Sequence, residues 1–165
     1  MRVLGIDPGL ATVGIGLIEA NSRNDLVAIE WLTLTTPSKT PLSSRLQELH
    51  SDLKRYLEET KPDYAVIERN FFAANEQSAL EVAHARGVLL LALAEANIPV
   101  GEATPLQLKS AITGDGKADK RQMQDMIVRM LGLTAIPKPD DAADGLALAV
   151  YGALTAHLHE AFLTK

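Results

Sequence analysis

The sequence predicts a single α/β domain over residues 1–165, on two observations. First, 47% of the 165 residues are hydrophobic and 22% are charged, which is the composition of a soluble globular chain long enough to bury a core of its own. Second, short apolar runs with the pattern of strands alternate with longer segments that have helical periodicity. The chain has no cysteine, so disulfides, zinc–thiolate sites and cysteine nucleophiles are excluded.

The first third of the chain indicates three strands followed by a helix. We expect the strands at residues 3–7, 14–19 and 27–34, with a turn at Pro8 and Gly9 between the first two. Three adjacent strands favour an antiparallel meander. Residues 42–59 place leucines three or four apart with charges between them, which is typical of an amphipathic helix lying on a sheet.

The rest of the chain alternates further strands with helices. We expect strands at 64–68 and 100–102 and helices at 78–96, 105–112, 117–131 and 144–163, with Pro137 and Pro139 separating the last two. The longest apolar stretch, around residues 87–94, is far shorter than the roughly 18 residues that span a bilayer. We therefore expect no transmembrane segment and, since the N-terminus does not read as a targeting signal, a cytoplasmic protein.

The acidic residues carry the chemical signal of this sequence. Asp7 and Glu68 each end an apolar strand, where a charge is costly unless it is paired. Asp141 and Asp144 lie three apart, on one face of the last helix. Carboxylates converging from two strand ends and a helix start would suit Mg²⁺ or Mn²⁺, and a pair of such ions can act on a phosphodiester.

Structural roles are also open to some of these residues. Asp7 could begin the turn at Pro8, and Asp140 or Asp141 could cap the last helix. Glu68 has no turn or capping role to explain it.

Motifs along nearly the whole chain resemble those of the RuvC-type crossover junction endodeoxyribonucleases, a family of the ribonuclease H-like superfamily. The motifs are Gly5-Ile6-Asp7-Pro8-Gly9, Pro62-Asp63-Tyr64 leading into Ile67-Glu68 and Phe71, Ser78-Ala79-Leu80, Ala85-Arg86-Gly87-Val88, Gln107 with Lys109, and Asp141-Ala142-Ala143-Asp144 followed by Leu146-Ala147. The resemblance implies a ribonuclease H-like fold. Its central mixed sheet would have five strands, three antiparallel and then two parallel, flanked by helices.

The resemblance also implies an activity. Such enzymes resolve four-way (Holliday) DNA junctions in recombination and repair, by symmetric nicks that leave a 5′-phosphate and a 3′-hydroxyl. Asp7, Glu68, Asp141 and Asp144 would be the catalytic carboxylates and would hold two Mg²⁺ ions per subunit, for which Mn²⁺ could substitute. Because Asp140 shares the helix face of Asp144, it stays open whether Asp140 or Asp141 holds metal. A nuclease that processes ribosomal RNA and a catalytically silent junction-binding module are the alternatives.

Substrate contacts are expected between residues 104 and 130. This segment holds five basic and three acidic side chains, although the whole chain has a net charge of −5. By the resemblance, Lys109 and Lys120 would contact junction DNA and Phe71 would stack on an unpaired base.

The predicted helix at 78–96 is apolar nearly all round, which indicates core or a subunit interface. The resemblance implies a homodimer, whose twofold symmetry suits two symmetric cuts. It also implies the branch-migration proteins RuvA and RuvB as partners.

Overall fold

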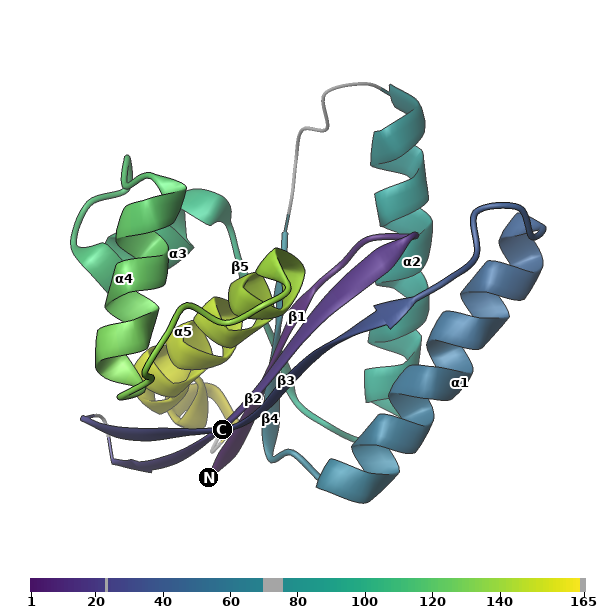
Figure 1. The fold of residues 1–165 in the computed structure, drawn as a ribbon. Helices are drawn as coiled ribbons and strands as arrows, with labels where there is room; N and C mark the ends of the chain where they lie inside the picture. Colours follow the sequence, from purple (N-terminus) through teal and green to yellow (C-terminus); the bar gives the residue numbers. More distant parts are fainter. Residues whose placement is uncertain (23, 70–75, 164–165) are drawn as a thin grey trace.

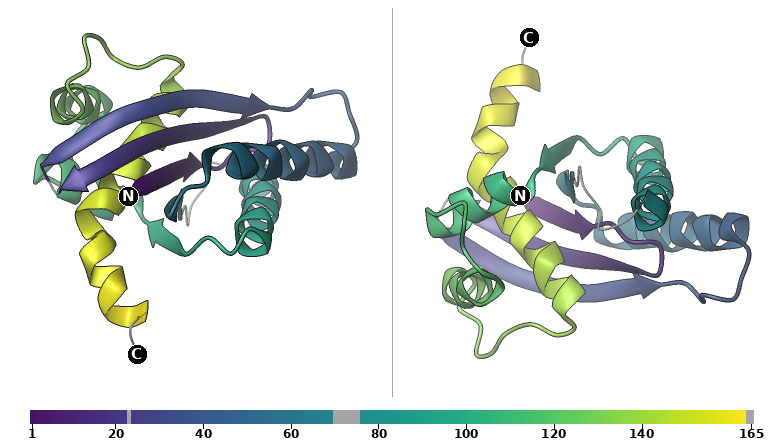
Figure 2. Two further views of the ribbon diagram at one scale, coloured as in Figure 1. Left: turned by 90° about the horizontal axis from the view of Figure 1, so that it is seen from below. Right: turned by 90° about the horizontal axis from the view of Figure 1, so that it is seen from above.

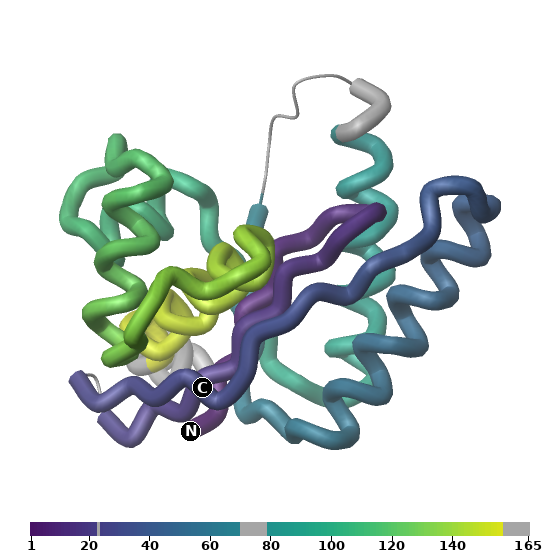
Figure 3. The backbone as a smooth tube through the Cα atoms, viewed as in Figure 1, coloured from purple at the N-terminus to yellow at the C-terminus, as the bar shows by residue number. Residues whose placement is uncertain are grey.

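A mixed five-stranded sheet forms the centre of the computed structural model, which describes residues 1–22, 24–69 and 76–163 apart from the side chains of 76–78 and 157–163 (Figure 1). The strand order is β3-β2-β1-β4-β5. The strands are β1 (Arg2–Asp7), β2 (Thr12–Ser22), β3 (Asp25–Thr35), β4 (Tyr64–Glu68) and β5 (Val100–Ala103). β1, β2 and β3 are antiparallel neighbours that lie side by side in Figure 3, whereas β4 and β5 run parallel to β1. The fold class expected from the sequence is thus confirmed.

Helices pack on both faces of the sheet. The helices are α1 (Leu42–Thr60), α2 (Glu76–Glu95), α3 (Pro105–Thr113), α4 (Lys120–Met130) and α5 (Asp140–Leu163). α1 and α2 share one hydrophobic core with the sheet, and α3, α4 and α5 share the other. α5 crosses the sheet, and its C-terminal end extends beyond it (Figure 2). Within the described residues, no helix combines the length and apolar character that crossing a membrane requires.

The starts of α4 and α5 differ from the sequence prediction by three and four residues, more than the two residues by which α2 differs. α5 begins at Asp140, four residues before the expected start, because the amides of Ala142 and Ala143 already donate to the carbonyl of Pro139. Two acidic residues in its first turn favour the positive end of the helix dipole. α4 begins at Lys120 rather than residue 117, because Asp119 and Gln122 form a reciprocal capping box.

Glycines let α5 lie directly on the backbone of β1 and β2. A Cβ at Gly5 would collide with the Gly145 carbonyl oxygen, and one at Gly14 with the Asp141 carbonyl oxygen. A Cβ at Gly16 would overlap the backbone of Leu146. No ordinary side chain fits at these positions, so the height and position of α5 over the sheet depend on them.

We predict that Gly16→Ala destabilises the fold by about 2–3 kcal/mol, because the added methyl group must push α5 off the sheet. Chemical denaturation measures the change. Ser22→Ala, at an exposed position of the same strand, is the control and should change the free energy of unfolding by less than about 0.5 kcal/mol. Equal stability of the two variants would contradict the close approach of α5.

Candidate active site

Asp7 and Glu68 lie side by side at the carboxyl ends of two parallel strands. In the register of β1 and β4, Ile6 pairs with Ile67, so the next residue of each strand, Asp7 and Glu68, share a row. Val66 packs in the core beneath α5, and strand alternation places Glu68 on that same face. The structure therefore brings these two predicted residues together on the α5 side of the sheet.

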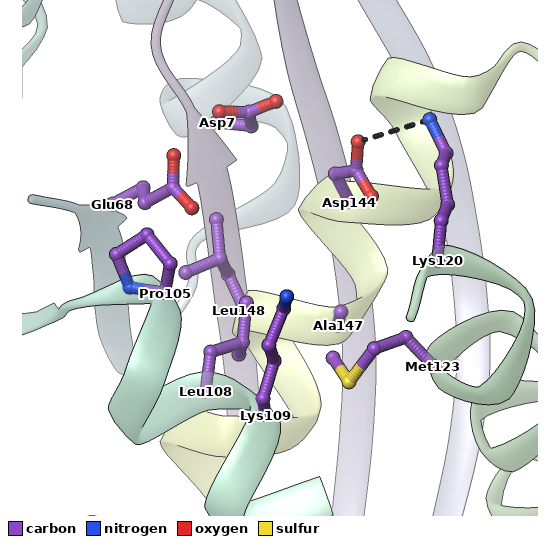
Figure 4. A pocket seen from close by; sticks show the side chains of 10 residues that line it. All are labelled: Asp7, Glu68, Pro105, Leu108, Lys109, Lys120, Met123, Asp144, Ala147 and Leu148. Carbon is purple, nitrogen blue, oxygen red and sulfur yellow. Dashed lines mark ion pairs between the residues drawn. The ribbon is translucent and has the colours of Figure 1, made fainter. Parts of the chain in front are cut away.

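The start of α5 completes the row. Gly14 is the partner of Asp7 in the β1–β2 ladder, and the Asp141 backbone lies against Gly14. Asp144, less than one turn further along α5, lines the same cavity as Asp7 and Glu68. Figure 4 shows Asp144 on α5, across the cavity from Asp7 and Glu68, with its carboxylate turned toward Lys120. The Asp141 side chain is exposed and is not part of the cavity lining.

The cavity has a volume of about 250 Å³ and is lined by three carboxylates, two lysines and a group of apolar side chains. Its apolar lining comes from α3, α4 and α5 and consists of Pro105, Leu108, Met123, Ala147 and Leu148. Lys109 reaches it from α3 and Lys120 from α4. Both predicted DNA-binding lysines therefore border the cavity that holds the carboxylates.

Burial and mutual repulsion dominate the electrostatics of the carboxylates. Burial, followed by the negative charges of Glu68 and Asp144, raises the pKa of Asp7 far above that of a free aspartate. A side-chain hydrogen bond joins Asp7 to Glu68 and acts in the same direction. Burial also raises the pKa of Asp144, although Lys120 opposes this shift. Negative charge therefore outweighs positive charge among these acids.

Lys120 is the cation that the structure places at the edge of this row. Its Nζ lies 3.2 Å from Asp140 Oδ2 and 3.8 Å from Asp144 Oδ2. Lys138 Nζ lies 2.6 Å from the other carboxylate oxygen of Asp140, and the two lysines lower the pKa of Asp140. Both carboxylate oxygens of Asp140 are therefore paired with lysines, and Asp140 does not line the cavity that holds Asp7 and Glu68.

The chemistry of these residues fits a divalent cation. Adjacent carboxylates that disfavour each other's ionisation are hard oxygen donors, and Mg²⁺ or Mn²⁺ would balance their charge. In the part of the chain that the structure describes, no three acidic side chains are gathered into a preformed metal cluster. The contact between Asp7 and Glu68 is the nucleus of the candidate site.

Two further residues bear on the sequence prediction. Phe71 lies outside the described residues, so its stacking role stays a prediction. Arg86, on α2, was given no role from the sequence, yet its Nε donates to the Glu68 carbonyl oxygen at 3.2 Å. Its position on an apolar helix offered no sign of this contact, since the partner is a backbone atom of a distant strand.

Comparison with known proteins identifies relatives along almost the whole chain. The family model described as crossover junction endodeoxyribonuclease RuvC matches residues 3–152. The RuvC of Chloroflexus aurantiacus is 52% identical over 156 residues, which are 94% of each chain. The structure of T. thermophilus RuvC in complex with Holliday junction substrate matches with a TM-score of 0.91 at 31% identity and covers 96% of each chain. The yeast mitochondrial Holliday junction resolvase Ydc2, at 18% identity and a TM-score of 0.65 over 98% of this chain and 85% of its own, shares the fold.

We predict that Asp7→Asn stabilises the metal-free protein at neutral pH. An aspartate whose pKa in the folded state exceeds the unfolded value of about 3.9 favours folding fully only below that value, and the contribution is lost as pH rises. The neutral amide avoids this loss, so in EDTA we expect its Tm to exceed that of the wild type by about 3–6 °C at pH 7.5 and to match it near pH 4.

Scanning calorimetry at the two pH values measures this difference. Asp125→Asn, an exposed position on α4, is the control for the change of net charge. A Tm gain that is the same at both pH values would show that Asp7 ionisation is not its cause.

Proposed function

The chain belongs to the RuvC family of crossover junction endodeoxyribonucleases, and we propose that it resolves four-way DNA junctions with Asp7, Glu68, Asp141 and Asp144 as catalytic carboxylates. The products would be symmetric nicks with a 5′-phosphate and a 3′-hydroxyl. The observation that carries the proposal is the register that sets Asp7 beside Glu68, with Asp144 across the same cavity.

We propose that these four carboxylates hold two Mg²⁺ ions per subunit and that Mn²⁺ can substitute. When bound, such ions stabilise charge on the attacking and leaving oxygens of a phosphodiester. The chain itself contributes oxygen ligands from three elements, β1, β4 and α5. Because two of the elements are strands of one sheet, Asp7 and Glu68 are held at a fixed spacing before any substrate arrives.

The lysines of α3 and α4 would hold the DNA backbone against the acids. Lys109 and Lys120 border the cavity, where their ammonium groups can bind phosphates on either side of the scissile bond. Lys120 now interacts with Asp140 and Asp144. A phosphate entering the cavity would offer it a further anionic partner, so the same side chain can offset repulsion between DNA and the carboxylates.

We propose that two copies of the chain pair through α2. Leu80 and Leu91 are 58% and 53% exposed in the single chain, and their spacing of three helical turns puts them on one face. Large exposed apolar side chains on one helix face mark a contact surface. Twofold pairing would present two active sites to the two strands of a junction. RuvA and RuvB as partners and a cytoplasmic location belong to the same proposal.

Substitution of the carboxylates tests the proposed chemistry. Asp7→Asn, Glu68→Gln, Asp141→Asn and Asp144→Asn should each reduce cleavage of a mobile four-way junction at least about 10³-fold in Mg²⁺, because each removes one proposed ligand. Asp140→Asn is the matched control and should stay within a few-fold of the wild type, since its carboxylate contacts Lys120 and Lys138.

Cleavage is measured by gel electrophoresis of labelled strands, and junction binding is followed in Ca²⁺ and should survive in all five variants. If Asp140→Asn is inactive and Asp141→Asn is active, the metal ligand is Asp140 rather than Asp141. Duplex DNA and structured RNA are tested in parallel. Preferential cleavage of RNA would show that RNA, rather than the four-way junction, is the substrate.

The lysine contacts are tested by salt dependence. Lys109→Ala combined with Lys120→Ala should weaken junction binding and reduce the slope of log affinity against log salt by roughly one for each lost phosphate contact. Fluorescence anisotropy at several salt concentrations measures the slope. Lys39→Ala with Lys54→Ala, on exposed positions of the opposite half of the molecule, is the control, and an equal effect of both pairs would rule out a local DNA contact.

A further inference from the structure

The carboxyl end of β4 is held from a different layer of the molecule. Arg86 of α2 donates from Nε to the Glu68 carbonyl oxygen at 3.2 Å. Its Nη2 lies 2.7 Å from Glu102 Oε1 on β5, and Arg69 Nη1 lies 3.5 Å from Glu102 Oε2. The guanidinium of Arg86 thus connects α2 to the carboxyl ends of two neighbouring strands, β4 and β5.

This contact acts at the residue where the strand ladder stops. Glu68 is the last residue of β4 and pairs with Ala103 of β5, while the Arg69 amide donates to the Ala103 carbonyl at 2.8 Å. The Glu68 carbonyl therefore marks the point where β4 leaves the sheet. The Arg86 guanidinium donates a hydrogen bond to a carbonyl while it is ion-paired with a carboxylate, so its orientation is more restricted than that of a lysine ammonium group.

Arg86 is also shielded from water. Its side chain is 24% exposed, compared with 70% for Arg55, which makes a similar short ion pair with Asp52 on the surface of α1. An ion pair as exposed as that of Arg55 contributes little to a fold. Because Arg86 is less exposed than Arg55, its interactions are screened less by water and can hold a backbone atom in place more firmly.

We propose that Arg86 is a positioning residue for Glu68: it fixes the backbone from which the Glu68 carboxylate projects toward Asp7, and Glu102 keeps the guanidinium in that orientation. The inference rests on the proposed role of Glu68 as a metal ligand. Groups that orient metal ligands typically change metal affinity 10–100-fold when they are removed. Arg86 would therefore tune the affinity of the site without contacting metal or DNA.

The Mn²⁺ affinity of the protein of residues 1–165 without DNA, measured by titration calorimetry, tests the proposal. We expect Arg86→Met to weaken Mn²⁺ binding about tenfold. Arg86→Lys should recover only part of this loss, and Glu102→Gln should cause a smaller loss because the bond to the Glu68 carbonyl remains. Arg55→Met is the matched control and should bind Mn²⁺ like the wild type.

A double-mutant cycle separates positioning from general stability. In a Glu68→Gln background, Arg86→Met should have little further effect on Mn²⁺ affinity, because the side chain through which it acts is already changed. In the otherwise unchanged protein, high Mn²⁺ should restore junction cleavage by Arg86→Met, as expected for a defect in metal affinity. Equal losses in both backgrounds, or no loss in folded Arg86→Met, would overturn the proposal.

The remaining variants keep the two proposals distinguishable. If Arg86→Met does not fold, as judged by thermal unfolding, Arg86→Lys and Glu102→Gln carry the same comparison. If Glu68→Gln itself leaves Mn²⁺ affinity unchanged, the proposed function of Glu68 fails. If Glu68→Gln weakens binding and the Arg86 variants do not, only the positioning role fails.

Discussion

The contact of α5 with the glycines of β1 and β2 is the constraint on which the site depends. Most helices lie on a sheet through a layer of side chains, which can repack when the helix shifts. Here Gly5, Gly14 and Gly16 bring backbone against backbone, so α5 lies as close to the sheet as backbone atoms allow. Because Asp141 lies over Gly14, this contact also determines where the acids of α5 stand relative to Asp7.

The site concentrates negative charge where partial burial reduces screening by solvent. Asp7 follows a strand whose inner residues are completely buried, and its raised pKa reflects both that burial and Glu68. Such repulsion opposes folding, and the two hydrophobic cores on either side of the sheet offset it. A cation that binds the folded chain would relieve the repulsion and stabilise the fold by linkage, so affinity for metal and stability share one origin.

Opposite charges are divided between different elements of the molecule. The acids come from the sheet and α5, while Lys109 and Lys120 come from α3 and α4, which pack against α5 on the same side. A chain with a net charge of −5 can thereby present a local basic rim to a polyanion while keeping carboxylates at the centre. On the opposite side of β4, Arg86 connects α2 to the Glu68 backbone. The end of β4 is thus supported from both helical layers.

The sequence alone determined the kinds of elements and singled out the acids that are proposed for the site. The local signals are the apolar runs of β1 and β4, the leucine periodicity of α1 and the prolines before α5. Another is a Glu that follows four apolar residues and has no turn or capping role.

Only the tertiary structure decided which residues meet. Three of its contacts join residues far apart in the chain: the parallel register sets Glu68 beside Asp7, Asp141 approaches Gly14, and Arg86 donates to a backbone carbonyl. Local patterns carry no information on such pairings, because register depends on how both faces of the sheet are packed. The starts of α4 and α5 differed from the prediction for a smaller reason, since single capping interactions decide where a helix begins.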